Sequence, residues 1–214
     1  MREAQEQGCR SSESRVTRRV LPALTLGILA LSGCTLTPRV DSVPDAASQR
    51  QAGELSEWQA KGRIAVAGAN TGGSGSFTWL QRGMQAQVQM HGPIGIGSLK
   101  LTLTDSTIRI ETADGQIFEA DEAQSELTAR LGAYVPARNL RYWLVGVAAP
   151  GEHQWSNAAD TTTLTQQDWR IDYQRYGVTA GTRLPMKLVA VSGPARVRIV
   201  IDRWTLEKLE PLDQ

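Results

Sequence analysis

Alternating hydrophobic and polar positions dominate the chain from Lys61 onward. The alternation is clearest between Met84 and Met90, where four apolar side chains share one face and three glutamines share the other, as on a half-buried strand. Similar segments predict strands near residues 62–67, 74–81, 99–104, 108–111, 116–119, 152–155, 161–166, 169–173, 186–191 and 195–201. Short turns such as Asp114-Gly115 join them, so we expect antiparallel meanders.

Helical spacing is convincing in two adjacent segments. In the first, Asp121 is a candidate N-cap, Leu127 and Leu131 lie one turn apart, and Gly132 ends the pattern. The second begins after Pro136 and ends near Gly146, with its apolar face formed by Leu140, Trp143, Leu144 and Val147. These elements predict an α+β fold: an open (half) antiparallel β-barrel of about nine to eleven strands, with a lid of short helices over an apolar cavity.

The first 34 residues have the parts of an export signal. Several arginines, the last of them Arg19, precede an uncharged run over residues 20–32. A membrane-spanning helix is the alternative, but it needs about 20 apolar residues, and Pro22 interrupts this run. The run ends in Leu-Ser-Gly-Cys34, which resembles the lipobox of bacterial lipoproteins. That resemblance implies cleavage before Cys34 and acylation of its sulfur and of the new amino terminus.

Residues 35–54 contain two prolines, many small polar residues and no apolar periodicity, which is typical of a tether. We therefore expect a lipoprotein signal peptide over 1–33, a lipidated N-terminus with a flexible tether over 34–54, and one binding domain over 55–214. Two or more acyl chains would hold such a protein stably on a bilayer.

Composition narrows the function classes. Hydrophobic residues make up 41% of the 214 and charged residues 21%, which excludes a disordered chain. A net charge of +1 gives no overall field for a nucleic acid. Two cysteines and two distant histidines provide neither a disulfide framework nor a metal site, and no cofactor is expected.

No catalytic constellation emerges from the polar residues. The Gly-Gly-Ser-Gly-Ser segment at 72–76 precedes a strand, whereas a nucleophile elbow requires a following helix, so a hairpin loop explains it better. Asp121 and Glu122 are adjacent on a helix and point apart, and His91 lacks a partner motif. We therefore do not expect an enzyme.

The apolar faces favour a lipid cavity, because a curved sheet with few covering helices leaves internal space. Trp79, Trp143, Trp155, Trp169 and Trp204 either line this cavity or belong to the core. The candidate lining residues are Phe77, Trp79, Val88, Met90, Leu99, Leu101, Leu140, Trp143 and Leu144.

The loop Gly92–Gly97 is unusually apolar for a hairpin turn. Ile94 either folds back into the core or forms a hydrophobic tip that enters the lipid interface.

These residues resemble the LolB family of outer-membrane lipoprotein receptors. The resemblance covers residues 55–206 and rests on the lipobox and on motifs of matching order and spacing. They are Lys61-Gly62-Arg63, Phe77-Thr78-Trp79, Gly92-Pro93-Ile94-Gly95, Leu140-Arg-Tyr-Trp143-Leu144-Val-Gly146, Leu184-Pro185 and Asp202-Arg203-Trp204.

The resemblance implies a periplasm-facing monomer, anchored to the outer membrane by Cys34. It would accept lipoproteins from the periplasmic carrier LolA, hold their acyl chains in the cavity and insert them into the membrane. It also implies a membrane-insertion loop at Pro93, Ile94 and Gly95, where relatives often have leucine in place of Ile94. A scaffold lipoprotein without a cavity and an acyl-chain hydrolase remain the alternatives.

Overall fold

The computed structural model describes residues 46–68, 72–92, 98–131, 134–158, 161–207, 209 and 212, all within the compact unit Pro38–Gln214. The predicted signal peptide, Cys34 and the loop residues Pro93, Ile94 and Gly95 lie outside the described residues. In the described ranges, no helix has the length and apolar character needed to cross a membrane.

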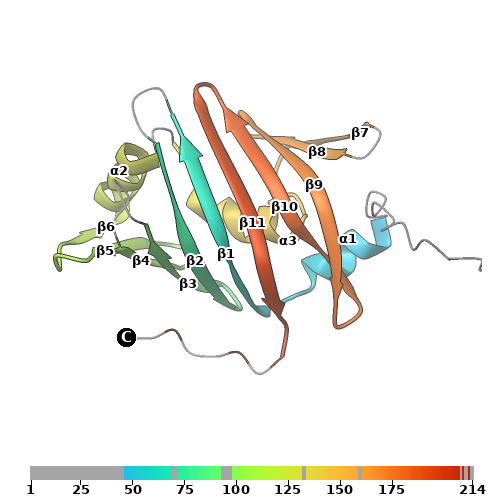
Figure 1. The fold of residues 1–214 in the computed structure, drawn as a ribbon, viewed down its shortest axis with the longest axis horizontal. Helices are drawn as coiled ribbons and strands as arrows, with labels where there is room; N and C mark the ends of the chain where they lie inside the picture. The colour runs from blue at the N-terminus through green and yellow to red at the C-terminus, as the bar shows by residue number, and fades with distance from the viewer. Residues whose placement is uncertain are drawn as a thin grey trace, which may run out of the picture. The chain divides into compact units, whose positions relative to one another are not determined.

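Eleven antiparallel strands form a single sheet in the described part of the chain (Figure 1). Their order across the sheet is β6-β5-β4-β3-β2-β1-β11-β10-β9-β8-β7. The strands are β1 (Glu57–Ala67), β2 (Gly72–Arg82), β3 (Gln85–His91), β4 (Ser98–Leu103), β5 (Ile108–Thr112), β6 (Ile117–Glu119), β7 (Gln154–Ala158), β8 (Thr161–Gln166), β9 (Trp169–Thr179), β10 (Thr182–Ser192) and β11 (Ala195–Thr205).

The strand order explains why helices cover one face. Strands β1 to β6 form one meander, β7 to β11 form a second, and pairing of β1 with β11 joins them. Since β6 and β7 are the two edges, the chain between them must cross the whole sheet. This crossing carries α2 (Ala120–Leu131), the 3-10 turn η1 (Ala137–Asn139) and α3 (Leu140–Val145). Figure 1 shows α3 behind β10 and β11. The crossing segment is the lid.

The predicted alternation decides which side chains face the lid. In the pairing of β3 with β4, Val88 lies opposite Leu101, and both are nearly fully buried. Their neighbours Gln87 and Thr102 pair on the other face of the sheet. The core therefore lies between the inner face of the sheet and the lid, and the predicted α+β fold with an open sheet of up to eleven strands is confirmed.

Two glycines allow close packing, one where β1 pairs with β11 and one at the end of α3 in the lid. Where β1 pairs with β11 the register shifts between Lys61 and Gly62, and a Cβ on Gly62 would lie 2.3 Å from the Val200 carbonyl oxygen. Gly146 ends α3 in the left-handed conformation, with φ of +83°. A Cβ there would also lie 3.0 Å from Cγ of Pro185, so the predicted helix terminator is required on both grounds.

Two predictions about helices need correction. Part of the expected flexible tether is the helix α1 (Ala46–Gly53), which packs against β10 and α3. Its weak amphipathic pattern hid it, because only Ala52 is fully buried. In α2, Asp121 lies in the first turn and not at the N-cap, since the helix begins at Ala120. The carboxylate is still favourably placed near the positive end of the helix.

Candidate functional site

An apolar cavity of about 90 Å³ lies between the inner face of the sheet and the lid. Both meanders contribute to its wall, together with α2, α3 and the segment between them. Its lining consists of Ile64, Phe77, Trp79, Val88, Met90, Leu101, Leu103, Leu127, Val135, Leu140, Trp143, Leu144, Trp169, Leu188, Ala190, Val197 and Ile199. None of these side chains carries a nucleophile, a carboxylate or an imidazole.

The structure brings eight of the nine candidate lining residues together at this cavity. The exception is Leu99, which is buried on β4 but lies outside the lining. Leu99 pairs with Met90 at one end of β4 and contributes to the core there. The candidate set came largely from β2 to β4 and α3, and it omitted the second meander. Val197 and Ile199 alternate visibly in the sequence, but only the pairing of β11 with β1 brings them to the same cavity.

Three tryptophans line the cavity, and each directs its indole N–H to a partner outside the lining. Nε1 of Trp79 donates to Oε1 of Gln81 at 2.9 Å, and Nε1 of Trp169 donates to the Tyr134 carbonyl at 3.2 Å. Nε1 of Trp143 donates to Oε1 of a buried glutamine at 2.9 Å. Because the polar edges are satisfied elsewhere, the rings expose hydrocarbon to the cavity.

That buried glutamine is Gln166 on β8, which sequence reasoning missed. Its Oε1 accepts the Trp143 indole N–H and the Ala149 amide at 3.0 Å, and its Nε2 donates to the Ala149 carbonyl at 2.8 Å. These bonds fasten α3 and the chain that follows it to the sheet. The sequence pattern could have indicated this role, because Gln166 lies on the same inward face of β8 as Leu164, where a side-chain amide without hydrogen-bond partners would be destabilising.

The remaining tryptophans belong to the core or pack against it. Trp204 packs edge-on against Trp58 and donates its indole N–H to the Pro185 carbonyl at 2.8 Å. Trp155 stacks on Tyr173, whose hydroxyl donates to the Trp143 carbonyl at 2.9 Å. Burial raises the pKa of the Tyr173 hydroxyl well above its usual range, so it remains a neutral hydrogen-bond donor.

The middle of the lid is attached to the sheet by exposed hydrogen bonds. Nη2 of Arg138 donates to the Ser106 carbonyl at 2.7 Å, and Nδ2 of Asn139 donates to Oε1 of Gln167 at 2.8 Å. On the next turn, Arg141 donates to the sulfur of Met84 at 3.1 Å. Each such bond contributes only about 0.5–1.5 kcal/mol to stability. The middle of the lid is therefore held less firmly than the end of α3, which the buried hydrogen bonds of Gln166 attach to the sheet.

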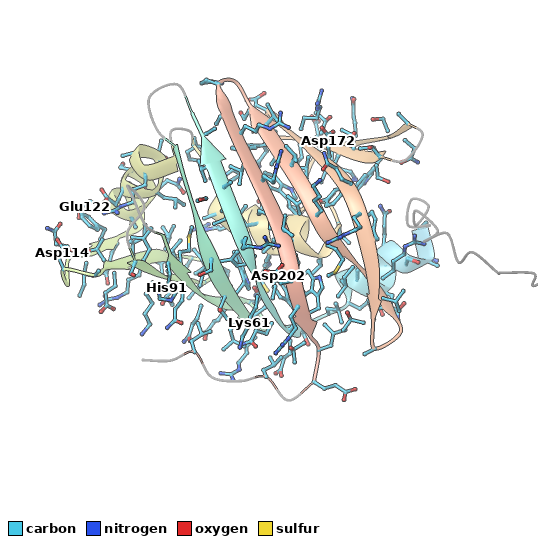
Figure 2. All side chains as sticks on the ribbon, in the orientation of Figure 1. Lys61, His91, Asp114, Glu122, Asp172 and Asp202 are labelled. Carbon is cyan, nitrogen blue, oxygen red and sulfur yellow. The ribbon has the colours of Figure 1, made fainter. Side chains whose placement is uncertain are left out.

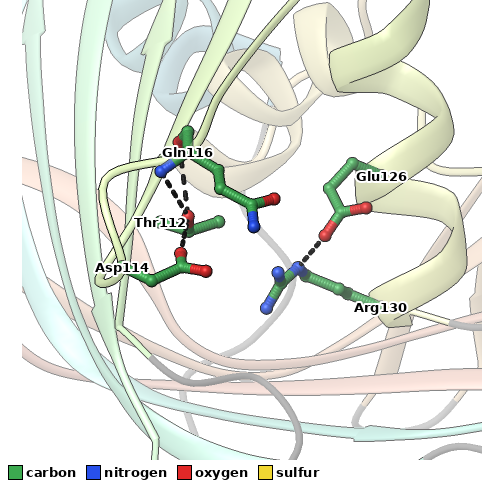
Figure 3. A network of polar contacts seen from close by, with 5 residues as sticks. All are labelled: Thr112, Asp114, Gln116, Glu126 and Arg130. Carbon is green, nitrogen blue, oxygen red and sulfur yellow. Dashed lines mark hydrogen bonds and ion pairs between the residues drawn. The ribbon is translucent and has the colours of Figure 1, made fainter.

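A polar network lies where α2 faces the turn between β5 and β6 (Figure 3). The Thr112 hydroxyl donates to the Asp114 carboxylate and accepts the Gln116 amide at 3.2 Å. The hydrogen bond from Thr112 lowers the pKa of Asp114, with a smaller effect from the charge of Arg130. Arg130 itself pairs with Glu126 along α2. The network stabilises a turn and a helix and leaves no free catalytic pair.

Titratable groups are scattered and do not converge on the cavity. Figure 2 shows His91, Glu122 and Asp172 well apart from one another. His91 lies exposed at a strand end, with Nδ1 3.3 Å from the Ser98 hydroxyl. The described residues contain no group of three or more side chains that could hold a metal ion. The site is therefore a hydrocarbon-lined space, and its chemistry is the burial of apolar surface.

Comparisons with known proteins agree with this geometry. A family model described as "Outer membrane lipoprotein LolB" matches residues 56–204. A protein named outer-membrane lipoprotein LolB from Alkalilimnicola ehrlichii is 33% identical over 188 residues, covering 85% of this chain and 94% of the relative. One of the same name from Pseudomonas aeruginosa is 29% identical and covers 90% of this chain and 98% of the relative. These names describe membrane lipoproteins and no enzymatic activity.

One solved structure shows a similar fold at low sequence identity. A DUF1329 family protein from Desulfovibrio piger superposes with a TM-score of 0.51 at 7% identity, covering 75% of this chain and 90% of that one. A LolA superfamily protein from Nitrosomonas europaea gives a TM-score of 0.48 at 10% identity, covering 79% and 96%. The family match spans most of the domain and the relatives align along nearly their whole length, so this chain belongs to the LolB family of outer-membrane lipoproteins.

Proposed function

We propose that this protein accepts lipoproteins from the periplasmic carrier LolA, shields their acyl chains in the cavity between sheet and lid, and inserts them into the outer membrane. The observation that carries the proposal is the lining of the cavity, which is entirely apolar even though three of its members are tryptophans with satisfied N–H groups. This space lies within the hydrophobic core of the domain and offers a ligand hydrocarbon contacts only.

The size of the cavity implies that binding requires the lid to move. An engineered cavity of about 150 Å³ in another protein takes up a single benzene molecule. The space here is about 90 Å³, which is too small for one acyl chain. The described conformation is therefore closed to an acyl chain. The side chains of Arg138, Asn139 and Arg141 hold the lid by exposed hydrogen bonds, so we expect the lid to open from this side, with loss of the apolar contacts of Ala137 and Leu140.

The driving force is the burial of hydrocarbon. Each methylene removed from water contributes about 0.8 kcal/mol, so a lipoprotein cannot cross the aqueous periplasm with its acyl chains exposed. The sequence carries no phosphate-binding loop, and transfer would follow increasing affinity from carrier to this protein to bilayer. No cofactor takes part in such a transfer.

Two further parts of the proposal concern residues at the membrane. Acylated Cys34 would anchor the chain with the domain facing the periplasm. Pro93, Ile94 and Gly95 would form the tip that enters the bilayer during delivery. The strands that flank this loop end at His91 and Ser98, which pair directly in the sheet.

Transfer of a labelled lipoprotein from LolA to the purified protein tests the proposal. We expect a Cys34→Ala form exported to the periplasm to accept the client, because the described residues that line the cavity all lie between positions 64 and 199. A scaffold lipoprotein would accept no client in this assay. A hydrolase would release free fatty acid, which is measured in the same reaction.

A further inference from the structure

The outer face of the sheet, which turns away from the lid, has a concentrated positive charge over four adjacent strands. The strands are β9, β10, β11 and β1, and Figure 2 labels Lys61, Asp172 and Asp202 on them. Register places Val200 between Arg63 and Lys187, and it places Arg198 beside Val189. Inward neighbours such as Ile64 and Ile199 line the cavity, so these charged side chains point to the opposite side.

Five cations on this face make no ion pair among the described residues: Arg175, Lys187, Arg196, Arg198 and Arg203. Arg63 pairs with Asp202 at 2.9 Å, and Arg170 pairs with Asp172 at 2.9 Å. A register shift beside Lys61 places Asp202 and Arg203 on the outer face together. Glu57, at the far end of β1, is the remaining carboxylate on these four strands. We call the whole surface the basic face.

This concentration contrasts with the balance of the domain. Residues 55–207 contain 15 lysines and arginines and 14 aspartates and glutamates. Eight of the cations and three of the carboxylates belong to the basic face. The rest of the domain is therefore acidic overall, with seven lysines and arginines against 11 aspartates and glutamates.

We propose that the basic face is a docking surface for an anionic lipid bilayer. Arginines and lysines near a negatively charged membrane each strengthen binding about fivefold, and eight of them on one surface act together. The relatives are outer-membrane lipoproteins, so a bilayer is the extended anionic surface nearest to this domain.

The composition of the face favours a lipid surface over a protein partner. Protein interfaces are centred on buried aromatic or large apolar side chains. The exposed large apolar side chains of the described residues are Met84, Ile117, Tyr134 and Val178, and only Val178, near the end of β9, lies on one of the four strands of the basic face. Val189, between Arg198 and Asp172 in the sheet, is only 1% exposed because longer neighbours cover it. Among the described residues the face therefore offers eight cations and no cluster of exposed large apolar side chains.

Docking of the basic face on the membrane does not depend on acyl transfer, but it would orient the domain for the proposed function. With the outer face of the sheet on the membrane, the lid on the opposite side faces the periplasm. A carrier arriving from the periplasm would then meet the lid directly.

Vesicle sedimentation of the unacylated Cys34→Ala protein tests the proposal without carrier or client. We expect binding to vesicles of phosphatidylethanolamine with phosphatidylglycerol, little binding to uncharged phosphatidylcholine vesicles, and loss of binding as salt is raised from roughly 0.05 to 0.5 M. Arg198→Glu should weaken binding at least about fivefold, and adding Arg196→Glu should weaken it further. The matched control is Arg50→Glu on α1, an equal charge change away from the basic face, which should alter binding less than twofold.

Three results would overturn the proposal. The first is no binding to anionic vesicles, and the second is equal binding to charged and uncharged vesicles, which would indicate apolar insertion. The third is a loss of carrier binding in Arg198→Glu with vesicle binding unchanged, which would assign the face to an acidic protein. Thermal melts check folding of each variant, and client acceptance by Arg198→Glu, which we expect to be normal, separates failure here from failure of the proposed function.

Discussion

Filling the cavity should make the protein more stable and less able to bind acyl chains. Ala190 lies on the inner face of β10, is almost fully buried and lines the cavity. Leucine has three more carbons than alanine, and at roughly 30 Å³ for each group the added volume matches the space available. Ala190→Leu is therefore the substitution that fits the cavity of about 90 Å³ without displacing the lid.

The magnitude follows from the cost of empty space. At about 24 cal/mol per Å³, filling the cavity stabilises the closed state by up to ~2 kcal/mol, which for a domain of this size raises Tm by roughly 4–8 °C. Acyl binding must then displace the new contacts, so the same free energy opposes it. We expect the affinity for a client lipoprotein to fall by up to about 30-fold.

Differential scanning fluorimetry and a client-binding titration measure the two effects on the same preparation. Ala67→Leu, an exposed position on the outer face of β1, is the matched control and should change neither quantity. A large fall in Tm for Ala190→Leu would show that the site is tightly packed core. A raised Tm with unchanged client affinity would show that acyl chains bind elsewhere.

Three other predictions concern the loop, the buried glutamine and the turn beside α2. Ile94→Glu should leave client acceptance nearly intact and reduce delivery to liposomes at least about tenfold, because burying an isoleucine at the interface gains roughly 1.5–3 kcal/mol. Ile94→Leu should resemble wild type. If Ile94 instead belongs to the core, Ile94→Glu will lower Tm and client acceptance together with delivery. Gln166→Ala should lower the free energy of unfolding by about 2–4 kcal/mol in denaturant titrations, because it leaves the Trp143 indole N–H and the Ala149 amide unpaired; a loss below about 0.5 kcal/mol would contradict this role. Since the hydrogen bond from Thr112 lowers the pKa of Asp114 from its ordinary 3.8, the stabilisation is present above that pH and is lost as the pH falls through the lowered pKa. The Tm difference between wild type and Asp114→Asn should therefore narrow in acid, and a difference independent of pH would refute this account.

Local pattern accounts for most of the fold that could be predicted. Alternation at Met84–Met90 marks β3 because a half-buried strand leaves a period of two in the sequence. Gly146 marks the end of α3 because few other residues adopt its backbone conformation. In contrast, the sequence of α1 does not predict a helix, because a single buried alanine leaves almost no periodic pattern and the helix depends on packing against β10.

The candidate site was predictable for β2 to β4 and α3 but not for the second meander. Val88 and Leu101 belong to neighbouring strands of one meander, so their common face follows from the turns. Ile64 and Ile199 are far apart in the chain and meet only because β1 pairs with β11. For Leu99, the alternation of apolar and polar residues predicts the correct face of β4 but not the position along the strand where the cavity ends.

Photocrosslinking of a transferred client tests most directly whether acyl chains occupy the cavity. Leu101 and Thr102 are adjacent on β4, and their side chains point to opposite faces, into the cavity and away from it. A photoactivatable leucine analogue at position 101 should crosslink to the acyl chains of a lipoprotein received from LolA, while the same analogue at position 102 should not. Equal crosslinking at both positions, or crosslinking at position 102 alone, would contradict the account.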